Sequence, residues 1–215
     1  MDLNQARKIM GQNFIGPQEL KKIAFQLNLP DPCLRPSPTI PLNPNQLKKI
    51  HQDYILILGM PKDKKNNKLT LNTLHSFFGW DPEKSEPCFY NQDWYLKEKF
   101  AKDKTLGFKW YLIKKNVEKK SRGKYPEDIS KSFKKQENFP SAILTAYVFF
   151  AYYFLTKGKI IWKHDFIWCS DKDNNGDRIY TGRYIDPNGI NKNGFNIHRH
   201  LSIRPCYGLV SQIKL

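Results

Sequence analysis

An apolar run at residues 142–155, AILTAYVFFAYYFL, constrains the fold more than any other feature of the sequence. Ser141 is a suitable N-cap and Gly158 a suitable stop, so the run predicts a long helix over residues 142–156. A helix that crosses a membrane needs about 20 apolar residues. We therefore expect this shorter helix to be buried in the core, and we expect no contact with a membrane.

The sequence after this helix has the pattern of antiparallel strands. Runs typical of strands at 160–162, 166–169, 178–185 and 195–204 alternate with the turn-rich segments DKDNNGD and DPNGINKNG. Asp, Asn and Gly favour tight turns between strands. We therefore predict a meander of antiparallel strands joined by polar loops.

The N-terminal part of the chain has a different composition. Apolar residues at helical spacing predict two short helices within a segment of residues 1–29, separated by Gly16 and Pro17. Six prolines then lie between residues 30 and 44. Proline at this density predicts an extended linker.

Residues 45–215 are expected to form the main domain. Strands are predicted at 54–59 and 109–113, and Thr70 is a suitable N-cap for a helix between them. With the long helix and the later strands, these elements predict the α+β class: an antiparallel sheet with a long packed helix and irregular loops, and a small N-terminal helical segment.

The chain is strongly basic. Its 215 residues include 36 Lys and Arg against 20 Asp and Glu, which gives a formal net charge of +16. Such an excess favours phosphates and other anions as partners, nucleic acid among them. The cationic residues are spread from Lys8 to Lys214, and a genome rich in A and T would give the same Lys-, Asn- and Ile-rich composition. Both interpretations of the charge stay open.

Two features bear on the compartment of the protein. The N-terminus, MDLNQARKIMGQNF, lacks the apolar segment of a signal peptide. The four cysteines, Cys33, Cys88, Cys169 and Cys206, have irregular spacing, which favours free thiols over disulfides. We expect a cytoplasmic protein.

Known catalytic patterns do not occur in the sequence. It has no GxSxG elbow, no GxxxxGK[ST] loop, no HExxH pair and no GxGxxG. Pairs such as Glu83-Lys84 and Glu98-Lys99 resemble part of a nuclease motif, but such pairs are common in Lys- and Glu-rich chains. We expect binding rather than catalysis, and no cofactor.

The segment DKDNNG at residues 171–176 resembles the first half of a calcium loop. Its twelfth position is Gly182, where a bidentate Glu is needed, and its flanks are predicted strands. We favour the alternative, a hairpin turn rich in Asp, Asn and Gly.

His198 and His200 lie two residues apart on a predicted strand, so both rings face one side. Such a pair could hold zinc, but no further ligand motif accompanies it. We favour structural histidines, or an anion-binding strip together with Arg199 and Arg204.

The alternation of the C-terminal strands separates a core face from an outward face. The core positions are Trp162, Phe166, Trp168 and Ile203. The outward positions, which are the candidate ligand-binding residues, are Asp173, Asn175, Arg178, Tyr180, Arg183, Tyr184, Asn191, Asn193, Asn196, His198 and His200. Tyr supplies contact area at low entropic cost while Asn adapts its hydrogen bonds, so we expect an unknown protein or other macromolecule as the ligand.

Three stretches carry a resemblance to a known family: KWYLIKKNV (109–117), the segment 139–190 with its "WCSD" and "R-x-Y-x-G-x-Y-x-D-x-x-G" patterns, and HRHLSIRPCYG (198–208). In their order and spacing they resemble C-type-lectin-like proteins, in particular the variable target proteins of diversity-generating retroelements in candidate-phylum bacteria. The resemblance implies a C-type-lectin-like fold and a ligand-binding role. The positions that such proteins diversify lie near the C-terminus.

Two rival hypotheses remain. The first is a nucleic-acid-binding protein or nuclease of a mobile-element or defence system, based on the net charge and on basic strips such as Lys114-Lys115, Lys119-Lys120 and Arg122. The second is a metal-dependent hydrolase that uses Asp171, Asp173 or His200.

Overall fold

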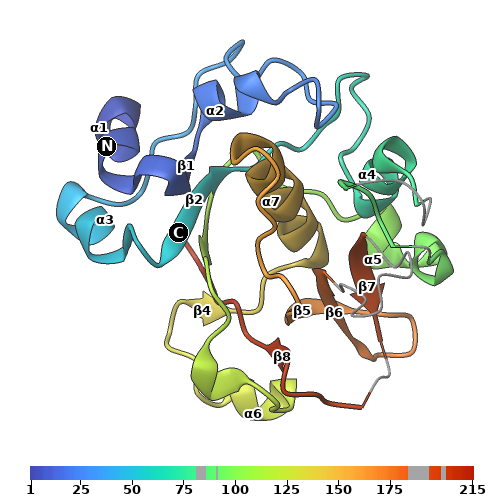
Figure 1. Cartoon of the computed structure of the whole chain (residues 1–215). Coiled ribbons are helices and arrows are strands. Elements are labelled where there is room, and N and C mark those ends of the chain that lie inside the picture. Colours follow the sequence, from blue (N-terminus) through green and yellow to red (C-terminus); the bar gives the residue numbers. More distant parts are fainter. Residues whose placement is uncertain (81–85, 91, 184–193, 200–201) are drawn as a thin grey trace.

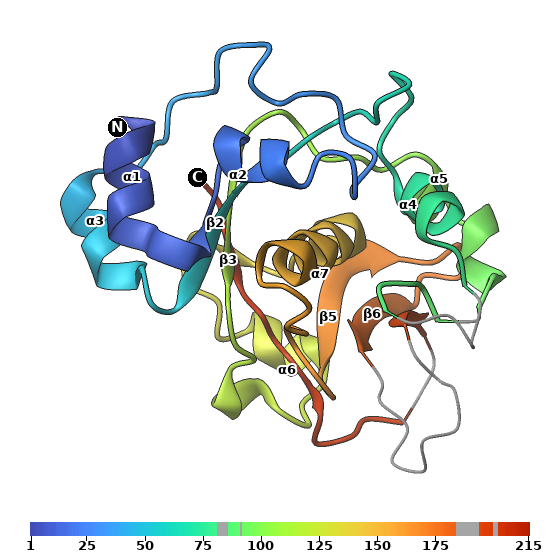
Figure 2. The same ribbon diagram turned by 45° about the horizontal axis from the view of Figure 1, so that its top comes forward.

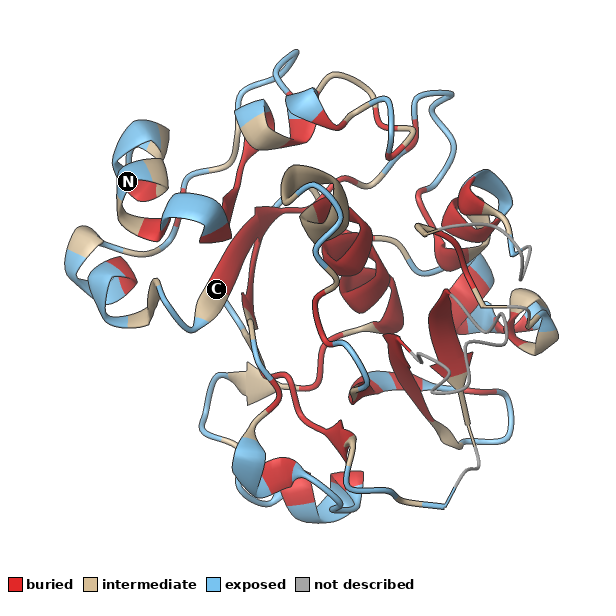
Figure 3. Cartoon of the chain, in the orientation of Figure 1, coloured by how far each residue is buried: buried red, intermediate tan, exposed pale blue. Residues whose placement is uncertain are grey.

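The centre of the structure is helix α7 (Ala142–Leu155), which passes between two β-sheets (Figures 1 and 2). The structure is a computed structural model that describes residues 1–80, 86–90, 92–183, 194–199 and 202–215. Every residue from 142 to 151 is buried, as Figure 3 shows, because the helix is apolar on all sides and has to be covered all round. The predicted helix, its Ser141 cap and its burial are confirmed. No helix in the described ranges is long and apolar enough to span a membrane.

The larger sheet has the strand order β1-β2-β3-β9-β4. Strands β2 (Tyr54–Leu58) and β3 (Trp110–Lys114) pair antiparallel along their whole length and confirm the two strands predicted there. The edge strand β1 (Phe14–Ile15) runs parallel to β2, and β9 (Gln212–Ile213) lies between β3 and β4 (Glu137–Asn138). The C-terminal end of the chain therefore returns to the first sheet.

The smaller sheet has the strand order β7-β6-β5-β8. Strands β5 (Phe166–Lys172), β6 (Arg178–Arg183) and β7 (Phe195–His198) are antiparallel neighbours, which confirms the predicted meander. Strand β8 (Tyr207–Gly208) pairs parallel to β5. The hydroxyls of Thr145 on α7 and Thr181 on β6 lie 2.9 Å apart and join the helix to this sheet.

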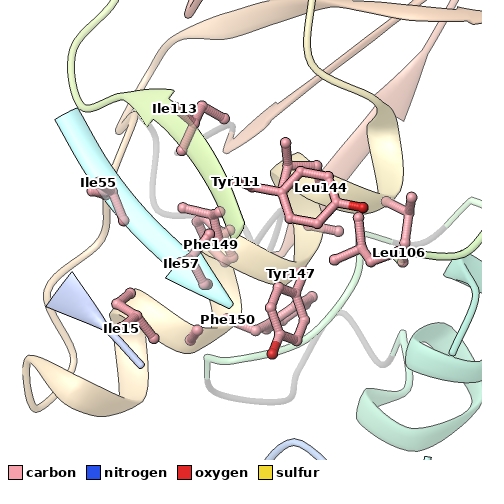
Figure 4. Close-up of a cluster of buried hydrophobic side chains, with 14 of the residues drawn as sticks. Ile15, Ile55, Ile57, Leu106, Tyr111, Ile113, Leu144, Tyr147, Phe149 and Phe150 are labelled. Atoms are coloured by element: carbon pink, nitrogen blue, oxygen red, sulfur yellow. The ribbon is translucent and has the colours of Figure 1, made fainter. Parts of the chain in front are cut away.

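The main core surrounds α7 and includes residues of both sheets. Figure 4 shows part of it, with Ile55 and Ile57 of β2 facing Phe149 and Phe150 of α7. The hydroxyl of Tyr147 donates to the carbonyl of Leu58 at 3.2 Å. Burial of so many large side chains is the main stabilising contribution to a fold of this size.

The N-terminal helices pack on the same core. They are α1 (Leu3–Met10), α2 (Pro17–Lys22) and α3 (Pro44–Ile50). Buried residues of this region, such as Leu20 and Leu27, belong to the same hydrophobic cluster as α7. The remaining helices are α4 (Leu71–Phe78), capped by Thr70 as predicted, α5 (Lys99–Lys102) and α6 (Pro126–Ser130).

Two predicted strands are wrong in their extent. Residues 160–162 form a turn, in which Trp162 has the left-handed φ of 54°. The strand predicted over 195–204 is interrupted: β7 ends at His198, and residues 202–206 are irregular. Residues that favour strands form one only where a neighbouring strand pairs with them, and no described strand pairs with residues 160–162 or 202–204.

Candidate ligand-binding cleft

Several candidate residues on β6, β7 and the β5–β6 turn are buried. Tyr180 is 1% exposed, Arg183 3% and Asn196 1%, and Asp173 at the β5–β6 turn is 7% exposed. The prediction that these four side chains form an exposed surface is wrong. Tyr180 belongs to a second hydrophobic cluster that covers the face of the small sheet opposite α7, formed by Ile129, Phe139, Phe166, Trp168, Tyr180, Tyr207 and Leu209. Arg183 lies on the other face, opposite Phe195 of the main core, and Asp173 is enclosed by its own turn and by Arg199.

The buried polar candidates have structural partners. Arg183 forms an ion pair with Glu86. Asn196 donates from Nδ2 to the carbonyl of Gly194 at 2.8 Å, and its Oδ1 lies 3.1 Å from Nε2 of His198. These contacts hold β6 and β7 in place and leave the side chains inaccessible to a macromolecule.

His198 is half-buried beside Tyr180, with ring centroids 5.8 Å apart, and lies 3.0 Å from the amide nitrogen of Gln92. Burial lowers the pKa of His198 to about 4. The imidazole is therefore neutral near pH 7, which argues against its part in an anion-binding strip. Within the described ranges, no group of three or more His, Cys, Asp or Glu residues could hold a metal ion.

The DKDNNG segment forms the hairpin turn between β5 and β6, as favoured from the sequence. Oδ1 of Asp173 accepts from the backbone amides of Asn175 and Asp177 at 2.9 and 2.8 Å, and Oδ2 pairs with Arg199 at 2.5 Å. Burial raises the pKa of Asp173, but the hydrogen bonds from Arg199 and the two amides hold the pKa below its ordinary value. Both carboxylate oxygens of Asp173 therefore have partners, one in the turn and one on Arg199.

The other candidates divide into two groups. Asn175 is exposed and Arg178 is half-buried. Tyr184, Asn191, Asn193 and His200 lie outside the described residues. Among the expected core residues, Trp162, Phe166 and Trp168 are buried, and Ile203 packs half-buried against the second cluster.

Arg178 lines a cleft of about 720 Å³ at the N-terminal end of α7. The cleft, which we call the α7 cleft, lies between β3, β9 and β4 of the larger sheet and the β5–β6 hairpin. Its lining residues are Lys104, Thr105, Leu106, Lys109, Trp110, Tyr111, Ser130, Phe133, Asn138, Phe139, Ser141, Ser170, Arg178, Gln212, Ile213, Lys214 and Leu215. Four of them carry a cationic side chain, and none carries a carboxylate side chain.

A buried acid, Asp171, lies behind the cleft wall. Asp171 accepts from Nζ of Lys104 at 2.6 Å and from the first amide of α7, that of Ala142, at 2.7 Å. The negative charge of Asp171 therefore neutralises the charge of Lys104 and satisfies the free amide at the start of α7. Lys109, Arg178 and Lys214 form no ion pair within the described part of the chain.

Arg178 is held by two contacts. Its Nη1 donates to the carbonyl of Cys169 at 2.9 Å, and its guanidinium lies 4.7 Å from the ring centroid of Phe139. Its Nε is buried and has no hydrogen-bond partner among the described residues. A buried donor without a partner lowers the stability of the fold. A ligand that supplies an acceptor to Nε would remove this cost.

The walls of the cleft are partly aromatic. Trp110 and Tyr111 come from β3, while Phe133 and Phe139 pack edge to face with centroids 4.8 Å apart. Cationic side chains above aromatic walls suit a ligand with an anionic group on an apolar or planar body. Of these lining residues, only Arg178 was a candidate from the sequence. Lys104 and Lys109 come from the segment before β3 and Lys214 from the far end of the sequence, and no motif joins them to Arg178.

Comparisons of the chain with protein-family models, with curated proteins and with solved structures found no match.

Proposed function

We propose that this protein is a non-enzymatic binding protein with a C-type-lectin-like fold, and that it binds an anionic ligand in the α7 cleft. The observation that carries the proposal is the convergence of Lys109, Arg178 and Lys214, which form no ion pair among the described residues, on one cavity. The described lining of this cavity contains no carboxylate side chain, and its fourth cation, Lys104, is paired with Asp171. Cations so arranged raise the local concentration of an anion and stabilise it once bound.

The composition of the cleft favours binding over catalysis. Its described lining contains serine hydroxyls but no His, Asp or Glu, which are the usual general bases that activate such a hydroxyl as a nucleophile. It does contain hydroxyl and amide groups, such as Ser141, Ser170 and Asn138, that can fix the orientation of a ligand through hydrogen bonds.

The fold assignment has its own support. The chain passes from a strand at residues 110–114 through a surface helix and the long helix α7 to a small antiparallel sheet, which is the order of elements in the proteins that the sequence resembles. The last strand, β9, then pairs with β3. A fold of this kind presents ligand-binding residues on a rigid frame.

NMR titration tests the proposal. Phenyl phosphate, with an anionic group on a planar ring, should shift the backbone amide signals of Lys109, Arg178 and Lys214, while the neutral phenol should leave them in place. Shifts that are equal for both compounds, or shifts confined to residues outside the cleft, would refute an anion site here.

A further inference from the structure

A second basic surface lies apart from the α7 cleft and shares no residue with it. We call residues 114–125, KKNVEKKSRGKY, the basic loop: six of these twelve residues are Lys or Arg, and only Glu118 is acidic. Glu118 pairs with Lys114 at 3.2 Å, and Arg122 pairs with Asp165 at 2.6 Å. The four remaining lysines, Lys115, Lys119, Lys120 and Lys124, form no ion pair within the described ranges.

The basic loop is held in a fixed shape. The amide of Glu118 donates to the carbonyl of Leu209 at 2.9 Å, and the amide of Leu209 donates to Oγ of the buried Ser121 at 2.8 Å. The amide of Gly123 donates to the carbonyl of Tyr207 at 2.9 Å. Gly208 permits this close approach, because a Cβ there would lie 2.6 Å from Val117. The lysines are therefore presented by an ordered backbone.

The turn after α7 adds a further cation. Trp162 donates from Nε1 to the carbonyl of Lys115 at 2.9 Å, which fixes the turn against the loop. The exposed Lys163 follows, and a hollow of about 420 Å³ separates it from Lys119 and Arg122. The positive φ of Trp162 shows that the chain adopts an unfavourable backbone conformation at this point, which its contacts with the loop stabilise.

The loop ends in an exposed aromatic residue. Tyr125 is 62% exposed and directly follows Lys124. Its backbone is fixed, because its carbonyl accepts from the amides of Asp128 and Ile129 at the start of α6, both at 3.1 Å. The basic loop therefore presents exposed lysines and, directly after Lys124, an exposed aromatic side chain. Cationic and aromatic side chains together are what proteins use to bind unpaired bases and the phosphates between them.

We infer that the basic loop is a binding surface for single-stranded nucleic acid. Lys119, Lys163 and the neighbouring lysines contact phosphates, and Tyr125 stacks on a base. A duplex offers phosphates but no free base faces, so single strands bind more tightly than duplexes. The contacts involve no base edge, so binding depends little on sequence.

Fluorescence anisotropy with a labelled 15-nucleotide oligothymidine and a 15-base-pair duplex tests this inference at several salt concentrations. For the single strand, the affinity should fall steeply as salt rises. The double variant Lys119→Glu/Lys163→Glu should bind at least about tenfold more weakly, with a salt slope reduced by about 1.4, since each lost phosphate contact lowers the slope by about 0.7.

Further variants separate base stacking by Tyr125 from the phosphate contacts of the lysines. Tyr125→Ala should weaken single-strand binding about tenfold with an unchanged salt slope, and Tyr125→Trp should restore it. Lys48→Glu/Lys49→Glu, which makes the same charge change on α3, should bind as the unmodified protein does. Lys109→Glu/Lys214→Glu in the α7 cleft should also keep its affinity for the oligonucleotide, so failure here and failure of the cleft proposal are distinguishable.

Several results would overturn the inference. They are no binding of the oligothymidine at low salt, an equal loss in the α3 control, a duplex affinity that exceeds the single-strand affinity, and an unchanged affinity in Tyr125→Ala. Binding to phosphatidylserine vesicles without binding to the oligonucleotide would assign the loop to a lipid surface instead.

Discussion

Tyr180 lies in the core and not on a binding surface because of the register of its strand. In the β5–β6 register Tyr180 lies opposite Trp168, so both residues face the same side of the sheet. From the sequence alone, Trp168 is expected in the core and Tyr180 at the surface. The two assignments are incompatible once the register is known, and a single sequence does not reveal that register.

The burial of Tyr180 makes a prediction about stability. Tyr180→Ala should lower the free energy of unfolding by about 3–5 kcal/mol, because it leaves a cavity in the second cluster. Urea denaturation measures this loss. Tyr125→Ala at the exposed position should change stability by less than about 0.5 kcal/mol. Equal stability of the two variants would place Tyr180 at the surface after all.

His198 makes a prediction about pH. Its pKa is about 4 in the folded protein and near 6.5 when unfolded, so the unfolded state binds the proton more readily. Stability is therefore fully present above pH 6.5 and is lost as the pH falls toward 4, by at most about 3 kcal/mol. Denaturation of wild type and His198→Gln between pH 4 and 7 measures this. A variant with the same pH dependence as wild type would contradict it.

At the scale of elements, strong local sequence patterns were sufficient to predict the longer helices and strands. The long helix, β2, β3, β5 and β6 were predicted because each has a clear apolar run or alternation with turn residues at its ends. Strands β8 and β9, with two residues each, have no such pattern. They exist because distant strands offer them hydrogen-bond partners, and this pairing cannot be recognised locally.

The start of α7 gives a prediction at this scale. Oγ of Ser141 accepts from the amide of Leu144 at 3.3 Å, so Ser141→Ala should lower the free energy of unfolding by about 1 kcal/mol. Thermal or urea denaturation measures the effect. The exposed Ser202 provides the control, since Ser202→Ala should be neutral. No difference between the two variants would mean that the cap contributes nothing to α7.

For the whole molecule, the N-terminal segment is part of the core. Its residues Phe14, Ile15, Leu20 and Leu27 are almost fully buried, and each contributes about 1.5–3 kcal/mol. Their sum is comparable to the stability of a typical domain. A chain without residues 1–29 should therefore lose cooperative thermal unfolding, as differential scanning calorimetry would show. An unchanged Tm would instead make residues 30–215 an independent domain.

The α7 cleft is also a property of the whole molecule. Lys104 and Lys109 precede β3, Arg178 begins β6, and Lys214 follows β9. Only the complete fold brings these cations together. From the sequence, the net charge left an anionic partner as one of two open interpretations, and Arg178 was predicted as a ligand-binding residue. The sequence could not predict the lysines beside Arg178, because their proximity depends on how the two sheets pack.

Isothermal titration with phenyl phosphate tests the central claim most directly. The wild type and Lys48→Glu/Lys49→Glu should bind it with the same affinity, and Lys109→Glu/Lys214→Glu should bind at least about tenfold more weakly, a change of about 1.4 kcal/mol. All three proteins carry intact cores, since the replaced lysines are exposed. Equal affinities for all three proteins, or no measurable binding to wild type, would contradict the account.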